Sequence, residues 1–275
     1  MKKIIIVLFC LGFLNIYLWS LIIFSNIDLA VYFLDIGQGD AIVLQLPGQR
    51  PAFVMIDTGF DKSASALLNK VLIGNRIDIL VLTHEDRDHS GGAPFILKNY
   101  KVSALVNNGL QNIKETWKMV LESLEDRPQI ALREGDKILY GDSTITVLNP
   151  GKEVYGVNNN ANSLVMLLES LGVSFLFTGD IDDKVEKKLL DSGLLKDVDV
   201  LKVPHHGSKY GSTNEFLKIV NPEISIITVG QNYFGHPRDE TLKRLANIKS
   251  LIFRTDEAGG IKIYLKDDKL IVSSL

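Results

Sequence analysis

Short apolar runs alternate with polar segments along most of the chain, and they predict an interleaved α/β fold. Runs such as residues 31–36, 41–46 and 77–82 are rich in β-branched residues and bounded by polar or glycine residues, as buried strands are. Apolar residues at helical spacing predict helices instead, for example over 63–73, 182–190 and 213–220. Because no linker, repeat or low-complexity stretch interrupts this alternation, residues 31–275 are expected to form one domain.

A different pattern occupies residues 4–24, which are mostly apolar and about as long as a bilayer span. Lys2 and Lys3 precede this run, and no good small-residue cleavage site follows it. We therefore expect residues 1–30 to be a membrane anchor, with a cleaved signal segment as the alternative. The positive-inside rule then places the domain on the extracytoplasmic side, or makes it a secreted protein if the segment is cleaved.

Composition narrows the possible functions only slightly. The 275 residues carry a formal net charge of −3, so binding to duplex DNA through bulk electrostatics is not indicated. Cys10 is the single cysteine, which excludes a disulfide within the chain. No glycine-rich phosphate loop of the dinucleotide or Walker type is present.

The most informative polar residues directly follow the predicted strand 77–82. His84, Asp86, Asp88 and His89 lie within six positions, where the chain leaves the strand. Imidazole and carboxylate groups are ligands for zinc, manganese or iron, and four of them in one turn are not easily packed as core. This stretch therefore predicts a metal site.

Further short motifs follow other predicted strands or fill the turns between them. They are residues 35–40 (DIGQGD), 56–59 (IDTG), 178–180 (TGD), 203–208 (VPHHGS) and 235–237 (GHP). Together with the stretch at 84–89 and in this order, they resemble the metallo-β-lactamase superfamily. More narrowly, residues 31–272 resemble the hydrolase domain of ComEC-type competence proteins. The resemblance implies an αββα sandwich with one or two divalent metal ions at one edge of its sheets.

The resemblance also implies a role for each ligand residue. His84 and Asp86 would bind a first ion, Asp88 and His89 a second, and Asp180 would bridge them. His206 or His205 would complete the second site, and we prefer His206, with His205 facing substrate. Neighbours on an extended backbone point to opposite sides, so one of the two is expected to face the metal.

Two departures from the superfamily pattern bear on the metal. Asp86 stands where histidine is usual, and the oxygen-richer set favours manganese over zinc. The third ligand histidine that is common in the superfamily has no counterpart before Asp180, and Asn162 or Ser163 would face the metals instead.

Supporting and catalytic roles follow for the remaining motif residues. Asp57 is expected to orient a ligand histidine, and Asp40 either supports the site or only shapes its turn. The catalytic candidates are Asp88, His205 and His236, although a structural role in its loop is the alternative for His236. Ser208 and Asn232 are candidate donors to a substrate phosphate.

These expectations indicate a metal-dependent hydrolase. The function that they favour is a ComEC-like phosphodiesterase or DNA nuclease acting on the outer side of the membrane. Its partners would be a phosphodiester substrate such as DNA, the membrane and components of a DNA-uptake machine. One alternative is a phosphoesterase acting on cell-wall or lipid phosphoesters. The other is a weakly active accessory protein of a DNA-uptake machine.

Overall fold

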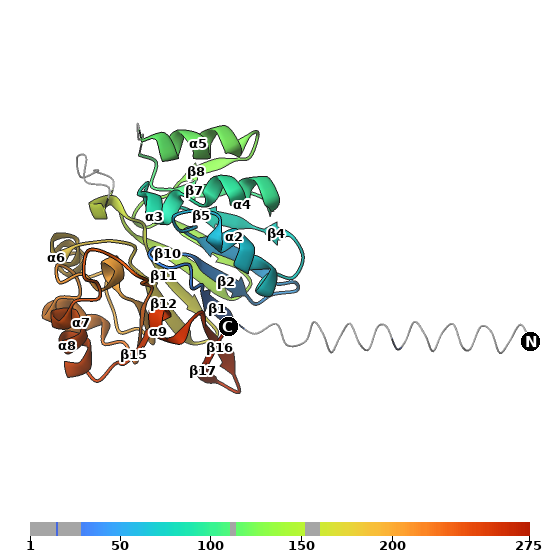
Figure 1. Cartoon of the computed structure of the whole chain (residues 1–275). Helices are drawn as coiled ribbons and strands as arrows, with labels where there is room; N and C mark the ends of the chain where they lie inside the picture. Colours follow the sequence, from blue (N-terminus) through green and yellow to red (C-terminus); the bar gives the residue numbers. More distant parts are fainter. Residues whose placement is uncertain (1–14, 16–28, 111–113, 152–159) are drawn as a thin grey trace, which may run out of the picture.

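Two β-sheets stacked face to face, with helices on both outer faces, form the part of the molecule that the computed structural model describes (Figure 1). The described residues are Asn15, 29–110, 114–151 and 160–275. The predicted anchor or signal segment lies outside them apart from Asn15. Among the described residues, no helix has the length and apolar character needed to cross a membrane.

The first sheet has eight strands in the described chain. In spatial order they are β17 (Lys269–Ser274), β16 (Ile261–Lys266), β1 (Ala30–Phe33), β2 (Ile42–Leu46), β3 (Ala52–Ile56), β5 (Ile79–Val81), β7 (Leu105–Asn107) and β8 (Gln129–Ala131). Pairing is antiparallel from β17 to β3 and parallel from β3 to β8. The carboxyl ends of β3, β5 and β7 therefore meet at one edge.

The second sheet has seven strands in the same described part of the chain. In spatial order they are β15 (Leu251–Arg254), β14 (Ile224–Ile227), β13 (Val200–Lys202), β12 (Val173–Phe177), β11 (Val165–Ser170), β10 (Ser143–Asn149) and β9 (Lys137–Tyr140). Strands β12 to β15 run parallel, whereas β9 to β12 pair antiparallel. A separate pair joins β4 (Arg76–Ile77) to β6 (Lys101–Val102).

Three apolar layers hold this sandwich together. Side chains such as Phe33, Val54, Phe177 and Ile226 fill the space between the sheets. Helices α2 (Ser63–Leu67), α4 (Ala93–Asn99) and α5 (Glu115–Leu124) cover the outer face of the first sheet, and α6 (Asp183–Asp191), α7 (Asn214–Val220) and α8 (Asp239–Asn247) cover that of the second (Figure 1). Each fully buried large side chain contributes about 1.5–3 kcal/mol. The predicted αββα sandwich is confirmed.

Several local predictions were wrong. Residues 77–82 are not one strand, because Asp78 interrupts them: its carboxylate accepts the Phe53 N–H at 2.9 Å, and the chain changes sheets there. The polar stretch after β5 is not only a loop, since it contains the short helix α3 (Arg87–Ser90). The helix predicted over 63–73 ends sooner, as α2 followed by the 3₁₀ turn Leu68–Lys70.

A buried carboxylate ties two helices of the outer layer together. Glu186 on α6 has no exposed surface, and it accepts hydrogen bonds from the Ser212 N–H and, at 2.8 Å, from the Thr213 N–H. Thr213 in turn caps α7 by accepting the Phe216 N–H. The start of α7 is thus fixed to α6 by polar contacts.

Replacing this carboxylate is expected to destabilise the domain. Glu186→Ala leaves two backbone donors without a partner, which costs about 2–4 kcal/mol of the free energy of unfolding. Urea denaturation measures the loss, and the exposed Glu223→Ala serves as the control, with a change below about 0.5 kcal/mol. Equal, small losses in both variants would contradict this role.

Candidate metal centre

The predicted metal residues come together at the edge where the parallel strands of both sheets end. Asp57 follows β3, and the segment 84–89 follows β5 in the first sheet. Asp180 follows β12, and His205 and His206 follow β13 in the second sheet. Because ligand sites of α/β sheets form outside the carboxyl ends of strands, this edge is the natural place for one.

Four of the six predicted ligands form one tight group. The ligand atoms of Asp88, His89, Asp180 and His206 all lie within 4.8 Å of one another. Asp180 Oδ2 is 3.2 Å from His89 Nε2 and 3.5 Å from His206 Nε2. His206 Nε2 is also 3.5 Å from Asp88 Oδ2. Two imidazoles and two carboxylates therefore converge on one point.

Three buried histidines share one hydrogen-bonding arrangement. In each, Nδ1 is held by a neighbour: Thr83 Oγ1 at 3.0 Å for His84, Asp57 Oδ2 at 2.7 Å for His89 and the Thr228 carbonyl oxygen at 2.7 Å for His206. Metal-binding histidines are typically oriented in this way, through the nitrogen that does not bind the ion. The Nε2 atom of each ring is left for a ligand.

The unpaired polar atoms at this edge fit a divalent ion. The Nε2 atoms of His84, His89 and His206 and the Oδ1 atom of Asp180 are buried and have no hydrogen-bond partner among the described residues. A buried polar atom without a partner costs free energy, and four of them at one place need a shared partner. Nitrogen and oxygen donors of these kinds suit zinc or manganese.

His84 and Asp86, the predicted ligands of a first ion, lie beside this group rather than within it. The His84 and His89 ring centroids are 4.1 Å apart, and His84 Nε2 lies 3.8 Å from Asp86 Oδ2. Asp86 also forms an ion pair with Lys114, which directly precedes α5. Binding of a first ion by His84 and Asp86 stays a prediction.

The backbone at His205 and His206 is not extended, so the alternation expected between these two neighbours does not apply, although His206 and not His205 belongs to the tight ligand group. Both residues have positive φ, 48° and 53°. Non-glycine residues rarely adopt this conformation, and it often marks functional sites. The two rings consequently reach the same carboxylate, because His205 Nε2 lies 3.8 Å from Asp180 Oδ2. His206 is buried, whereas the His205 side chain keeps 32% of its surface exposed.

Asp57 contacts the residues that follow β5 as well as His89. Its Oδ1 accepts the Thr83 N–H at 2.8 Å, and its Oδ2 accepts the Thr83 hydroxyl at 2.7 Å. Its φ of 57° lies in the left-handed region, which aspartate tolerates better than most residues. This geometry suits the orienting role predicted for Asp57.

Beneath the site lies a buried ion pair that sequence reasoning missed. Lys202 Nζ is 2.5 Å from Asp40 Oδ2 and 3.9 Å from Asp180 Oδ1, and both Lys202 and Asp40 are almost fully buried. Thr228 Oγ1 donates to the other Asp40 oxygen. Asp40 therefore supports the site rather than only shaping its turn. The one available signal was a lysine among the apolar residues Val200, Leu201 and Val203, directly before the motif at 203–208.

Burial and neighbouring charges shift the pKa values of the carboxyl and imidazole groups at the centre. Burial opposes ionisation of Asp180, but His89 and His206 outweigh it and hold the pKa of this carboxyl well below its usual range. Burial likewise disfavours charged His89, yet the Asp180 and Asp57 carboxylates raise its pKa well above the ordinary value. Burial and the nearby His89 lower the pKa of His84 to about 4, so this ring is neutral at pH 7.

Of the remaining predicted catalytic and substrate residues, His236 lies next to His205. The His236 ring centroid is 5.5 Å from that of His205, and burial with the two neighbouring histidines lowers the pKa of His236 to about 4. Asn232 uses its amide within the loop, donating to the Gly230 and His236 carbonyls and accepting the His236 N–H. Ser208 is only 3% exposed. Phosphate contacts by Asn232 and Ser208 stay predictions.

The segment where a third histidine is usual supports Asp180 instead. The Ser163 hydroxyl accepts the Asp180 N–H at 3.3 Å, and the Asn162 carbonyl accepts from the Asn108 amide at 3.2 Å. Both residues are buried. Ser163 therefore positions the loop that carries Asp180.

Removing the orienting contact on His89 is expected to weaken metal binding. Asp57→Asn keeps the shape of the side chain but presents a weaker acceptor to His89, so the affinity for manganese or zinc falls about 10–100-fold. Competition against a fluorescent chelator measures it. The matched control is Asp35→Asn, at an exposed turn where Asp35 accepts the Gly37 N–H. Equal affinities of the two variants would contradict the role of Asp57.

Metal affinity is also expected to rise with pH through the neutral range. The raised pKa values of His89 and His206 keep these rings protonated in the metal-free protein, and an ion must displace those protons. Each displaced proton makes binding about tenfold tighter per pH unit, up to the pKa of the ring. Calorimetry in buffers of different ionisation enthalpy counts the released protons. No release at pH 6–7 would contradict the expectation.

Comparison with known proteins agrees with the geometry of the site. The family model described as the metallo-beta-lactamase superfamily matches residues 34–231. Among curated proteins, ComE operon protein 3 of Bacillus subtilis is 34% identical over 85% of this chain, and Recombination protein 2 of Haemophilus influenzae is 28% identical over 86%. Competence protein ComA of Neisseria gonorrhoeae is 28% identical over 86%. The matches cover 33%, 29% and 32% of these relatives, so the chain spans about a third of their length.

Solved structures show the same fold at low sequence identity. The metallo-beta-lactamase fold protein YhfI from Bacillus subtilis is 14% identical with a TM-score of 0.59, covering 86% of this chain and all of that one. CmlA, a diiron beta-hydroxylase from Streptomyces venezuelae, is 13% identical with a TM-score of 0.58, over 86% of this chain and 54% of that one. On the match to its family model, this chain belongs to the metallo-β-lactamase superfamily.

Proposed function

We propose that the protein is a metal-dependent phosphodiesterase acting on nucleic acid, with one or two manganese or zinc ions. The observation that carries the proposal is the convergence of Asp88, His89, Asp180 and His206 with unpaired, buried donor atoms. The similarity to competence proteins supports nucleic acid as the substrate class and components of a DNA-uptake machine as partners.

The predicted ligands would divide between two ions. His89, His206, Asp88 and Asp180 would hold one ion, and His84 with Asp86 would add ligands toward a second. A bound divalent ion supplies a Lewis acid that polarises a phosphoryl oxygen and activates water at neutral pH. The chain itself keeps the rings fixed through Asp57, Thr83 and Thr228, so no reorganisation is needed when substrate arrives.

His205 is the candidate for moving a proton to the leaving group. Its ring is partly exposed and lies near both Asp180 and His236, so a substrate can reach it from solvent. General acids of this kind contribute about 10²–10⁴-fold to a rate. His236, with its low pKa, is neutral at pH 7 and would orient His205 or the substrate.

We also propose that the domain works on the outer side of a membrane. The support is the apolar run at 4–24 with Lys2 and Lys3 before it, which fits an anchor under the positive-inside rule.

Hydrolysis should depend on both the metal and the Asp180 carboxylate. With manganese, the protein is expected to cleave bis(4-nitrophenyl) phosphate and plasmid DNA, and EDTA abolishes both activities. Asp180→Asn is expected to lower kcat/KM by about 100-fold or more, because one ligand oxygen and one charge are lost. Release of 4-nitrophenol and gel analysis of the plasmid measure the two reactions.

Lys243→Ala on the exposed side of α8 is the control and keeps full activity. Absence of metal-dependent cleavage of either substrate would overturn the proposed function. Cleavage that survives in Asp180→Asn would indicate a contaminating enzyme.

A further inference from the structure

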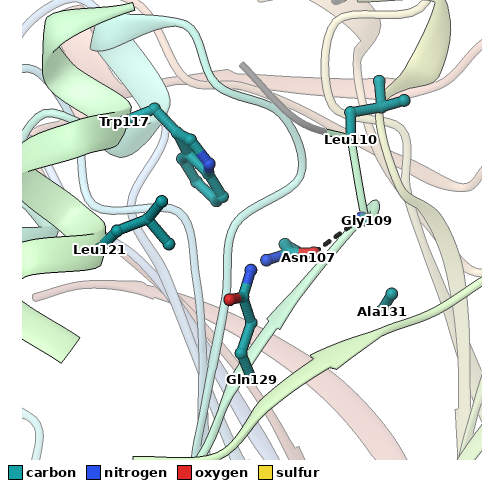
Figure 2. Close-up of a pocket in the computed structure, with 7 residues that line it drawn as sticks. All are labelled: Asn107, Gly109, Leu110, Trp117, Leu121, Gln129 and Ala131. Atoms are coloured by element: carbon teal, nitrogen blue, oxygen red, sulfur yellow. Dashed lines mark hydrogen bonds between the residues drawn. The ribbon is translucent and has the colours of Figure 1, made fainter. Parts of the chain in front are cut away.

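A cavity of about 490 Å³ lies between helix α5 and strands β7 and β8. Its walls include Asn107, Leu110, Trp117, Leu121 and Gln129 (Figure 2). This volume is within the range of small-molecule sites, which combine apolar walls with a few polar groups. None of the functional roles assigned above uses the cavity.

One polar group in the cavity has no partner. Asn107 is 1% exposed, and its Oδ1 accepts the Gly109 N–H at 2.7 Å, which fixes the orientation of the amide. Its Nδ2 is buried without a hydrogen-bond partner among the described residues, and Figure 2 shows it pointing toward Gln129, into the space below Trp117. A buried donor left unpaired costs about 1–3 kcal/mol, so a ligand with an acceptor would gain from filling this place.

The other walls suit a flat aromatic ring. The Trp117 indole and the aliphatic side chains of Leu110 and Leu121 provide apolar surface. Gln129 is exposed on β8 and can turn either its oxygen or its nitrogen to a ligand. Proteins usually hold an unstacked nucleobase in two ways together. Side-chain amides form hydrogen bonds with the edge of the base, and an aromatic side chain stacks on its face. No carboxylate lines the cavity within the described chain.

Two contacts connect residues next to the cavity wall with the segment that carries the predicted ligands. Asn108, the residue after Asn107, donates to the Thr83 carbonyl, directly before His84. On the other wall, Trp117 lies one helical turn after Lys114, which pairs with Asp86. Both contacts reach the chain at 83–86, directly before the ligand pair Asp88 and His89.

We propose that this cavity is a nucleobase subsite, which receives an unpaired base of the strand whose phosphodiester lies at the metal centre. The inference rests on the proposed phosphodiesterase function and narrows its substrate to single-stranded or locally opened nucleic acid. The base is held by the Asn107 Nδ2 donor, the Gln129 amide and the Trp117 ring.

Two matched substrates test the subsite. The four nucleoside 5′-(4-nitrophenyl phosphates) carry a base, and methyl 4-nitrophenyl phosphate has the same leaving group without one. Asn107→Asp keeps an acceptor for the Gly109 N–H and replaces the Nδ2 donor with a second carboxyl oxygen. It is expected to lower kcat/KM about three- to tenfold for the nucleoside substrates and less than twofold for the methyl ester.

Gln129→Leu is expected to lower kcat/KM for the nucleoside substrates as well. Because Gln129 is exposed, this second variant tests the subsite even if the buried Asn107 variant misfolds. Lys137→Ala, exposed on β9, is the control for a general surface effect. Equal losses on both kinds of substrate, or no loss on either, would overturn the subsite.

A binding measurement separates this inference from the proposed function. In EDTA, the four deoxynucleoside 5′-monophosphates are expected to quench tryptophan fluorescence with saturation, and Trp117→Phe removes the quenching. If the protein hydrolyses neither substrate but quenching saturates and needs Trp117, the subsite stands and the proposed activity fails. Absence of saturable quenching at millimolar nucleotide overturns the subsite even if hydrolysis occurs.

Discussion

The ion pair between Asp40 and Lys202 joins the two sheets at the point where the metal centre is built. Asp40 comes from the loop between β1 and β2, and Lys202 ends β13, so the pair bridges the sandwich. Removing two charges from water costs on the order of several kcal/mol per ion, and that cost is recovered only with good geometry and further hydrogen bonds. The Gly179 carbonyl at 3.3 Å and the Thr228 hydroxyl provide such contacts.

The backbone of the same aspartate holds the neighbouring loops. The Asp40 N–H donates to the Asp88 carbonyl at 3.1 Å, and the Asp40 carbonyl accepts the Gly59 N–H at 2.8 Å. Gly39 lies so close to this segment that an added Cβ would sit 2.3 Å from the Asp88 carbonyl oxygen. The glycine-rich turn therefore packs directly against α3 and fixes the position of Asp88 and His89. A buried lysine here also balances the negative charge that Asp40 and Asp180 bring together.

Much of this arrangement could be predicted from the chain, and the exceptions have physical reasons. The order of strands and helices follows from apolar periodicity, and the ligands at 84–89 stand out because so many polar groups follow one buried strand. Lys202 could not be assigned, since a lysine in a strand gives no indication of a partner that folding brings from another sheet. His205 and His206 have left-handed backbone conformations, which a pattern of residue types does not encode. Asp78 did carry a signal, as a charged residue inside an apolar run.

The strand order of the first sheet has a consequence for how the domain is made. β1 lies between β2 and β16, and the register pairs Ala30 with Gln45 on one side and Tyr264 on the other. While the chain is being synthesised, one edge of β1 stays unpaired until β16 arrives. An open strand edge can recruit strands from other chains, and pairing over such a separation is slow. The interval before β16 pairs with β1 is thus when this domain is most exposed to aggregation, and a chaperone that covered the edge of β1 would protect it.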